Sequence, residues 1–326
     1  MSTIWQVGGG LSRSPYDQLL IKHSVALIGP GYSGKWSADR SDEEFSGHWV
    51  RQFATEPQIG DVILLRIGSN RVVAVGIIAS EYQYLEQFDD VHGWSLQHGR
   101  RVRWKLLSHP QVFSSRVFGA NPQRFSRVNS PEVVKFVNDV LSVELDSWRR
   151  DPLLRLPLVL ESWEEPPQWL NKLVGLASDW WGMIWNHSEF GELPSEGEML
   201  VHFVIPFFRG LGWPQELLAV QWNQRDLAVF QKLPRLPENC FLVVEAKRLG
   251  VGAESALKQG INYAVNLNKQ CNVLLTDGIR YQLYDAAKEF ELSEYANLVA
   301  LKTKAARLLE RLQYRRLVKT RTVAGN

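Results

Sequence analysis

The stretch Phe241-Leu-Val-Val-Glu-Ala-Lys247 decides the fold of the C-terminal half of the chain. Its apolar start has the size of a buried β-strand. Side chains alternate along a strand, so Glu245 and Lys247 face one side and Ala246 faces the other. Taken alone, Glu-x-Lys on an edge strand is most often a surface ion pair. The acidic residues near this strand therefore decide whether the two charges form a functional site.

Regular elements are predicted on both sides of this strand. Short apolar runs bounded by turn residues indicate strands, apolar residues at helical spacing indicate helices, and Asp277-Gly278 is a hairpin signal. The predicted elements, in chain order, are a helix at 198–212, strands at 218–220, 227–230 and 241–247, a helix at 254–267, and strands at 272–275 and 281–284. This order predicts an α/β unit.

Asp226 stands at the start of the preceding strand, so its carboxylate is expected beside that of Glu245. Two adjacent carboxylates repel, which raises one pKa unless a cation is present. Mg²⁺ (or Mn²⁺) resolves this repulsion because hard divalent ions prefer oxygen ligands. We therefore expect Asp226 and Glu245, assisted by Glu198, to bind a divalent metal ion. Lys247 would orient or deprotonate a water molecule or stabilise a phosphate, and Gln259 would position the same water.

The polar residues, taken in order, resemble a known enzyme family. Glu198, Asp226, Glu245-Ala-Lys247 and Gln259-x-x-x-Tyr263 are similar to the motifs of the PD-(D/E)XK nuclease superfamily. The similarity is greatest to the N-terminal nuclease domain of type I restriction motor subunits, covers about residues 196–290 and includes Leu211-Gly-Trp213, Gln259 to Ala264 and Thr276-Asp-Gly278. The resemblance implies an α/β nuclease core with catalytic Glu198, Asp226, Glu245, Lys247 and Gln259.

Two features differ from that family. Arg225 stands where many members have Pro or Gly, at a position that makes no metal contact in the family. No helicase motor follows the nuclease-like region, and no complete phosphate-loop motif is present. ATP-driven translocation is therefore not expected.

The first 130 residues are predicted to be rich in β-strands, because short apolar runs alternate with Gly and Pro. Trp5-Gln-Val-Gly-Gly-Gly10, Ile28-Gly-Pro-Gly31, Pro57-x-Ile-Gly-Asp61, Val75-Gly76 and Arg100-Arg-Val-Arg-Trp104 resemble EVE-like domains of the PUA superfamily. The resemblance implies a small β-barrel that holds a flipped, modified base in an aromatic cage. Such a site needs stacking faces and a basic rim.

Four aromatic residues are candidate walls of this cage, although any single Trp is more often part of a core: Trp5, Trp36, Tyr82 and Trp104. The candidate basic rim consists of Arg100, Arg101, Arg103 and Lys105. Residues 131–195 are predicted to form an acidic, helical connector, which holds six of the 13 Trp residues. That segment is interpreted as packing against the flanking domains, since Trp often marks interfaces.

The C-terminal segment 302–321 is strongly basic, with eight Lys or Arg and one acidic residue. Arg315, Arg316 and Lys319 are candidate nucleic-acid contacts, because basic clusters favour polyanions. An apolar stripe of four leucines suggests a dimer helix as an alternative: Leu301, Leu308, Leu309 and Leu312.

Composition excludes several classes of protein. The chain of 326 residues is 45% apolar and 22% charged, as in globular proteins, and holds no apolar run of about 18 residues that could span a membrane. Two cysteines exclude a disulfide framework and a four-cysteine zinc site. No signal peptide is visible at the N-terminus. A cytoplasmic location, with no membrane partner, is expected.

These observations predict an α+β multidomain protein: a PUA/EVE-like β-barrel at 1–130, a helical Trp-rich connector at 131–195, and a PD-(D/E)XK nuclease domain with a basic C-terminal helix at 196–326. The resemblances imply a modification-dependent, type IV-like restriction endonuclease that cuts foreign DNA with Mg²⁺ or Mn²⁺ as a homodimer. The alternatives are a binding protein for nucleic acid or a nucleotide signal with a silent nuclease fold, and an RNA-directed nuclease.

Overall fold

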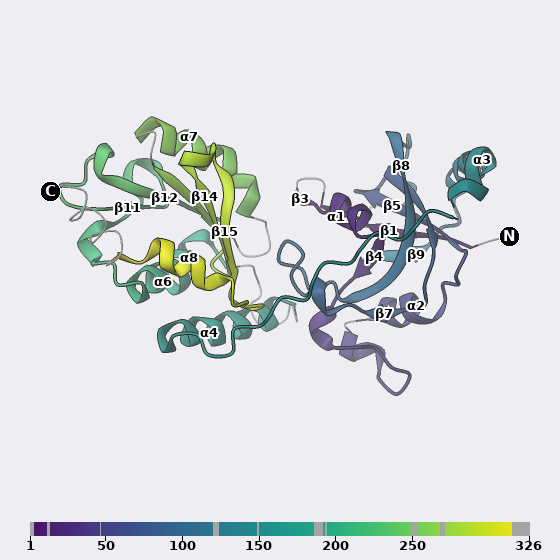
Figure 1. The fold of residues 1–326 in the computed structure, drawn as a ribbon, viewed down its shortest axis with the longest axis horizontal. Helices are drawn as coiled ribbons and strands as arrows, with labels where there is room; N and C mark the ends of the chain where they lie inside the picture. The colour runs from purple at the N-terminus through teal and green to yellow at the C-terminus, as the bar shows by residue number, and fades with distance from the viewer. Residues whose placement is uncertain are drawn as a thin grey trace. The chain divides into compact units, whose positions relative to one another are not determined.

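The computed structural model describes residues 3–11, 14–45, 47–119, 124–148, 150–185, 192, 194–248, 253–267 and 271–314. The chain divides into two compact units, Met1–Val159 and Leu160–Asn326, here called unit 1 and unit 2. Both units combine helices with a β-sheet, as Figure 1 shows. The prediction of a mixed α+β protein is confirmed. None of the helices in these ranges is long and apolar enough to cross a membrane.

Unit 1 is built on a seven-stranded sheet in which β4, β8, β6, β5, β1 and β9 are neighbours in this order and β7 pairs with β8. The strands are β1 (Ile4–Gly8), β4 (Val25–Ile28), β5 (Val62–Ile67), β6 (Arg71–Ile78), β7 (Gln83–Tyr84), β8 (His98–Val112) and β9 (Phe125–Arg127). Among the described strands of this sheet, only β1 and β5 pair in parallel. β4 and β9 end the ladder, so within the described residues hydrogen bonds do not close the sheet into the predicted barrel.

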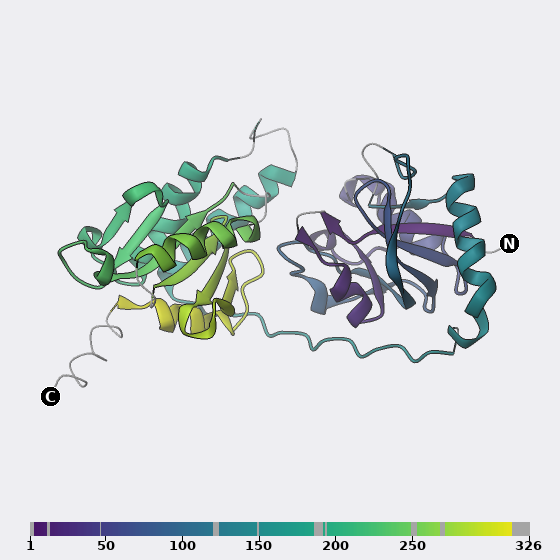
Figure 2. The same ribbon diagram turned by 90° about the horizontal axis from the view of Figure 1, so that it is seen from above.

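Smaller elements complete unit 1: β2 (Gly10–Leu11), β3 (Ser14–Pro15), α1 (Asp17–Lys22), α2 (Trp49–Thr55) and α3 (Pro131–Trp148). The central strand β5 is buried at all six positions. Ile63 and Leu65 contribute to one apolar cluster, and Val62 and Leu64 contribute to a second one that α3 covers. Figure 2 shows α3 lying along the sheet.

The predicted connector 131–195 is divided between the two units. Val133 and Val137 of α3 pack on the sheet of unit 1. Leu170 and Ala177 of α4 (Gln168–Trp185) pack in the core of unit 2. The two helices therefore do not form one separate element. Each presents an apolar face to a different core, and helical periodicity in the sequence does not specify which core receives it.

Unit 2 contains a six-stranded sheet with strands adjacent in chain order: β10 (Leu218–Val220), β11 (Leu227–Phe230), β12 (Cys240–Ala246), β13 (Asn272–Thr276), β14 (Arg280–Asp285) and β15 (Glu291–Asn297). All neighbours are antiparallel except β12 and β13, which α7 (Leu257–Leu267) connects as a parallel crossover. The strands predicted from the sequence are confirmed to within two residues, and β15 was not predicted.

Helices cover both faces of this sheet. In Figure 1, α7 lies on one face, and α6 (Ile205–Gly210) and α8 (Ala305–Leu312) lie on the other. The predicted helix 198–212 consists of α5 (Glu196–Met199), a π-helical segment at Leu200–Val204, and α6. A π-helical turn contains more residues than an α-helical turn. Side chains beyond it therefore point in other directions than regular α-helical spacing predicts.

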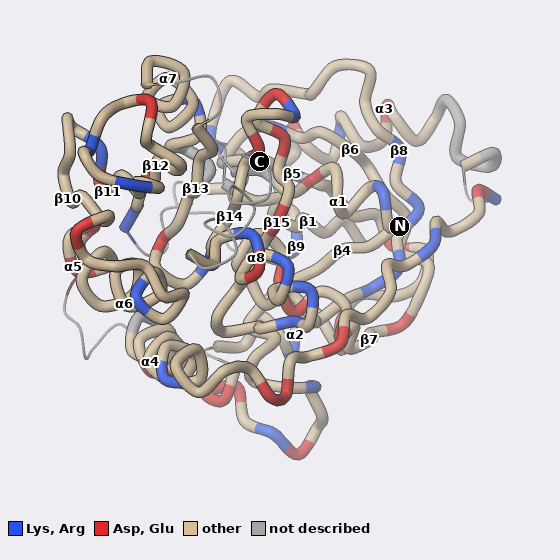
Figure 3. Tube along the Cα trace, turned by 60° about the vertical axis from the view of Figure 1, so that its left-hand side comes forward, with Lys and Arg blue, Asp and Glu red and all other residues tan. Residues whose placement is uncertain are grey.

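The leucines proposed as an alternative dimer stripe are part of the unit 2 core. Leu301, Leu308, Leu309 and Leu312 are at most 9% exposed. Trp213 Nε1 donates a 2.6 Å hydrogen bond to the Leu312 carbonyl, which fixes the end of α8. The dimer-helix prediction was therefore wrong for these residues. Of the basic residues on α8, blue in Figure 3, Arg311 bonds to Asp285 Oδ2 at 3.0 Å. Arg315, Arg316 and Lys319 lie outside the described residues.

Asp61 fixes the start of β5 in unit 1. Its carboxylate accepts hydrogen bonds from Thr3 N, Trp5 Nε1 and Gln58 N, each at 3.0 Å. We expect Asp61→Ala to lower the free energy of unfolding of unit 1 by about 3 kcal/mol, because it leaves buried donors without an acceptor. Urea denaturation of the full chain measures this loss. The exposed Glu86→Ala in the same unit is the control, and equal stability of the two variants would contradict the assignment.

Candidate active site

Asp226 and Glu245 meet at the carboxyl end of β12. Leu227 pairs with Val244, so one step further along the antiparallel ladder Asp226 lies opposite Glu245. The Ala246 amide donates a 2.8 Å hydrogen bond to Asp226 Oδ2, which fixes that carboxylate against the backbone of β12. The structure thus brings together the two carboxylates that the sequence analysis paired.

Glu245 is 1% exposed, and its Oε1 has no hydrogen-bond partner within the described residues. Burial, followed by the neighbouring Asp226 carboxylate, raises the pKa of Glu245 to about 7. Burial also raises the pKa of Asp226. A buried carboxylate oxygen without a donor is unfavourable unless a proton or a cation compensates it. The pair therefore has the chemistry of an oxygen-ligand cation site.

Close packing of α7 buries Glu245. Gly260 of α7 lies so near β12 and β13 that a Cβ atom there would be 2.8 Å from Val273 Cγ1 and 3.4 Å from Glu245 Cγ. Any larger residue would push the helix away from the strands. Gly260 therefore keeps the carboxylate out of bulk water.

Lys247 brings a positive charge to the same edge of the sheet. Its backbone amide donates to the Thr276 carbonyl at 2.8 Å, which extends the pairing with β13 past Ala246. Its Nζ lies 3.4 Å from Glu196 Oε1. The Lys247 charge opposes the rise in pKa of both Asp226 and Glu245, while the Glu196 charge adds to it. Four charged groups therefore act on one another at this edge.

Glu198, the helix glutamate that the sequence analysis placed at the metal, has a different role. Its carboxylate accepts from Ser195 N at 2.7 Å and from Ser195 Oγ at 2.8 Å, forming a capping box at the start of α5. These hydrogen bonds lower the pKa of Glu198. Residues two apart on a helix point about 200° apart, so Glu196 reaches Lys247 and Glu198 does not. The Ser-x-x-Glu spacing was the available signal for this cap.

Gln259 lies on the exposed side of α7, and its Nε2 donates to Tyr263 Oη at 3.2 Å. The Tyr263 ring stacks on the guanidinium of Arg225, with 5.0 Å between Arg225 Cζ and the ring centroid. Within the described residues, no hydrogen bond joins Gln259 to Asp226, Glu245 or Lys247. Its role at a water molecule stays a prediction.

The described residues contain no group of three or more His, Cys, Asp or Glu side chains spaced to hold a metal ion. A Mg²⁺ ion keeps several waters and needs only one or two carboxylates from the protein. Asp226 and Glu245 supply two such ligands, and the buried Oε1 of Glu245 lacks a donor. The residues therefore fit a magnesium ion with two protein ligands.

Two of the four candidate cage residues, Trp36 and Tyr82, lie together in unit 1. Trp36 and Tyr82 lie edge to face, with ring centroids 6.4 Å apart, and Trp36 N donates to Tyr82 Oη at 3.1 Å. Tyr82 stacks on His98 at 5.9 Å. Burial lowers the pKa of His98 to about 4, so this imidazole is neutral at pH 7. Trp36 Nε1 and Gln97 Oε1 are buried without a hydrogen-bond partner in this part of the structure.

Trp5 and Trp104 do not join the cluster of Trp36, Tyr82 and His98. Trp5 is 2% exposed, stacks on Phe125 at 5.0 Å and bonds to Asp61, so it belongs to the core. Trp104 lies on β8 six residues from His98, which is about 20 Å along a strand. Its Nε1 donates to the Val25 carbonyl at 2.9 Å. The prediction was wrong for these two residues because both indoles have partners inside the fold.

The predicted basic rim is mostly engaged in holding the chain. Arg100 is 0% exposed and donates to the carbonyls of Phe53 and Ala54 at 2.8 and 2.7 Å, so it cannot contact nucleic acid. Arg101 bonds to the Leu154 carbonyl, and Arg103 Nε donates to the Asp151 carbonyl at 2.8 Å. Lys105 is half-buried. Arg101 and Arg103 attach the segment after α3 to β8, and Arg100 attaches α2 to it.

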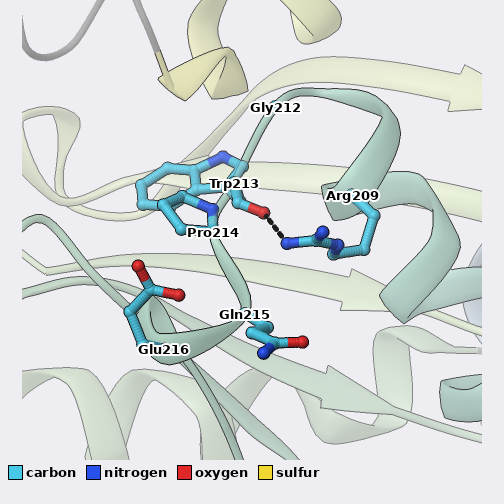
Figure 4. Close-up of a pocket in the computed structure, with 6 residues that line it drawn as sticks. All are labelled: Arg209, Gly212, Trp213, Pro214, Gln215 and Glu216. Atoms are coloured by element: carbon cyan, nitrogen blue, oxygen red, sulfur yellow. Dashed lines mark hydrogen bonds between the residues drawn. The ribbon is translucent and has the colours of Figure 1, made fainter.

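A separate hollow of 450 Å³ in unit 2 lies at the end of α6 and contains none of the site residues. Figure 4 shows its lining: Arg209, Gly212, Trp213, Pro214, Gln215 and Glu216. Arg209 donates to the Trp213 carbonyl at 2.8 Å. The Leu-Gly-Trp motif therefore supports the turn after α6 and the end of α8 rather than the candidate active site.

The raised pKa of Glu245 predicts a specific dependence of stability on pH. Its stabilising contribution is present below an unfolded pKa of about 4.5 and is lost as the pH rises through about 7. We expect Glu245→Gln to raise the free energy of unfolding of the metal-free protein by about 3 kcal/mol at pH 8 and by little at pH 5. Thermal unfolding in EDTA measures both values. The exposed Glu238→Gln is the control, and a gain independent of pH would contradict the assignment.

Comparisons with known proteins complete the description. A family model described as "Domain of unknown function (DUF8426)" matches residues 7–120, within unit 1. No curated protein matches the chain. Among solved structures, the chain is similar to a fragment assigned as an HsdR subunit of a type I restriction enzyme from Vibrio vulnificus YJ016, with a TM-score of 0.27 and 16% sequence identity. The match covers 39% of this chain and 26% of that chain, so the chain spans about a quarter of that structure's length.

Proposed function

We propose that the chain is a restriction-type endonuclease whose unit 2 hydrolyses phosphodiester bonds in DNA with a divalent metal ion. The single observation that carries the proposal is the pairing of Asp226 with Glu245, whose buried Oε1 lacks a donor. A surface ion pair would not have this arrangement, because its carboxylates would be solvated. Lys247, which directly follows β12, adds the third element of the site.

Each residue has a defined task in this proposal. Asp226 and Glu245 hold Mg²⁺ or Mn²⁺, which supplies Lewis-acid stabilisation of charge on the phosphate. Lys247 places its ammonium group beside them and either orients water or contacts a phosphate oxygen. Glu196 holds the Lys247 ammonium group in place through their 3.4 Å ion pair. Hydrolysis of both DNA strands needs two such sites, so we propose that a homodimer or a pair of copies on DNA cuts the duplex.

Unit 1 is proposed to select modified DNA. The support is the cluster of Trp36, Tyr82 and His98, beside which Trp36 Nε1 and Gln97 Oε1 are buried without partners. Aromatic faces stack on a base, and an unpaired donor and acceptor are suited to its polar edge. Expected localisation in the cytoplasm, where the chain would meet foreign DNA, is part of the same proposal.

The nuclease assignment predicts that cleavage depends on Glu196 rather than on Glu198. We expect Asp226→Asn, Glu245→Gln and Lys247→Met to lower the rate of DNA cleavage at least about 100-fold, since each removes a group that acts on the transition state. Glu196→Gln should lower it about 10-fold or more, because Lys247 loses its ion pair. Glu198→Gln should cut within about twofold of wild type, because Gln preserves the capping box.

Plasmid cleavage with Mg²⁺, with Mn²⁺ and in EDTA measures these rates. An RNA substrate in parallel tests the RNA-directed alternative. If Glu198→Gln is inactive and Glu196→Gln is active, the assignment of the helix glutamate is wrong. If the wild-type protein binds DNA but cuts neither polymer with either metal, the silent nuclease fold is the correct alternative.

Selection by unit 1 predicts a separate result. Wild type should cleave DNA that carries a modified cytosine at least about 10-fold faster than unmodified DNA. Trp36→Ala should abolish this preference while cutting of unmodified DNA stays unchanged, because unit 2 is intact. Methylated, hydroxymethylated and unmodified plasmids of one sequence provide the comparison. Trp104→Ala, outside the Trp36–Tyr82–His98 cluster, is the matched control. Equal cutting of all plasmids by wild type would refute the modified-base proposal.

A further inference from the structure

The loop immediately before Asp226 is held in an unfavourable conformation. It connects β10 to β11, and a 3.0 Å hydrogen bond from Gln221 N to the Asp226 carbonyl closes it. Gln221, Asn223 and Gln224 have φ values of 51°, 48° and 69°, in the left-handed region that favours glycine. Three such non-glycine residues within four positions make this a strained segment of the described chain.

Arg225 holds this loop in place. Its guanidinium lies between two aromatic rings, with Cζ 5.5 Å from the Trp222 ring centroid and 5.0 Å from that of Tyr263. NH1 donates to the Asn223 carbonyl at 2.8 Å, and NH2 donates to the Tyr263 carbonyl at 3.4 Å. The side chain is 8% exposed, and its Nε has no hydrogen-bond partner in the described structure. The residue that departs from the family pattern is thus the anchor of the loop.

The strained loop presents three amide side chains to solvent. Gln221, Asn223 and Gln224 are all exposed, and none of their side chains has a hydrogen bond within the described residues. Glycine at these positions would remove the strain, so the amides stand there at a cost in backbone energy. Asn and Gln amides pair with base edges and with phosphate oxygens.

Resting on the proposed function, we infer that the loop Gln221–Arg225 is the part of unit 2 that contacts the DNA strand beside the scissile phosphate. The loop is continuous with Asp226, so its side chains lie within one or a few residues of the predicted metal ligand. Arg225 is a positioning residue, because it holds the loop through Asn223 and does not itself reach solvent. Asn223, at the tip, is the principal contact.

Two substitutions at Asn223 separate its contribution to DNA binding from its effect on the stability of the fold. Asn223→Gly removes both the amide and the strain, so it should raise the Tm of the full chain while weakening DNA binding about 5–10-fold. Asn223→Asp keeps the backbone preference and adds a negative charge beside the phosphates, so it should weaken binding at least about 10-fold with an unchanged Tm. Glu289→Gly, at φ 53° in the turn between β14 and β15, is the matched control. It should raise the Tm without weakening binding.

Fluorescence anisotropy with a labelled DNA duplex in EDTA measures binding without cleavage, and kinetics with Mg²⁺ measure KM and kcat separately. The inference requires a higher KM for both Asn223 variants. Wild-type affinity in both Asn223 variants overturns it, even where the wild-type protein cuts DNA. Weakened binding by both variants in a protein that never cuts would keep the loop as a DNA contact and refute the proposed nuclease. Binding of RNA but not DNA would overturn the assignment of DNA as the partner.

Discussion

The constraint on which unit 2 depends is the burial of the Glu245 carboxylate, whose Oε1 accepts no hydrogen bond within the described residues. Glu245 lies under α7 because Gly260 allows the helix to approach within contact distance. Asp226 is fixed opposite by the Ala246 amide, so the two negative charges cannot separate. Lys247 compensates only part of this charge, since the pKa of Glu245 remains raised. Two close, buried carboxylates are unfavourable for folding unless a proton or a cation compensates them. For this reason the edge of β12 is the candidate active site.

Local pattern predicted the parts of unit 2 that depend on strand alternation and turns. Asp226 and Glu245 were placed side by side correctly because short apolar runs mark the strands that carry them and side chains alternate along a strand. Glu198 was not, because its position in a capping box and the π-helical segment that follows determine which glutamate faces Lys247. The leucines of α8 show a different limit of prediction from sequence. An amphipathic stripe has the same sequence pattern whether it packs inside the chain or against a second copy.

Unit 1 was harder to predict, because the identity of a tryptophan does not determine its environment. Trp5 and Trp36 look alike in sequence, yet Asp61 accepts from the first indole N–H and, within the described residues, no acceptor receives the second. Arg100 belonged to an apparent basic surface, but backbone carbonyls from a distant helix surround it. Such partners come from residues about 50 positions away, which periodicity and charge counts do not reveal.

The parallel pairing of β12 with β13 also sets the order in which a nascent chain acquires its chemistry. Asp226 and Glu245 emerge from the ribosome on an antiparallel pair of strands, before α7 and β13 exist to cover them. Until synthesis has passed Thr276, these carboxylates are solvated and Lys247 lacks the carbonyl that fixes its backbone. In the nuclease proposed above, the site would therefore be complete only after β13 has been made.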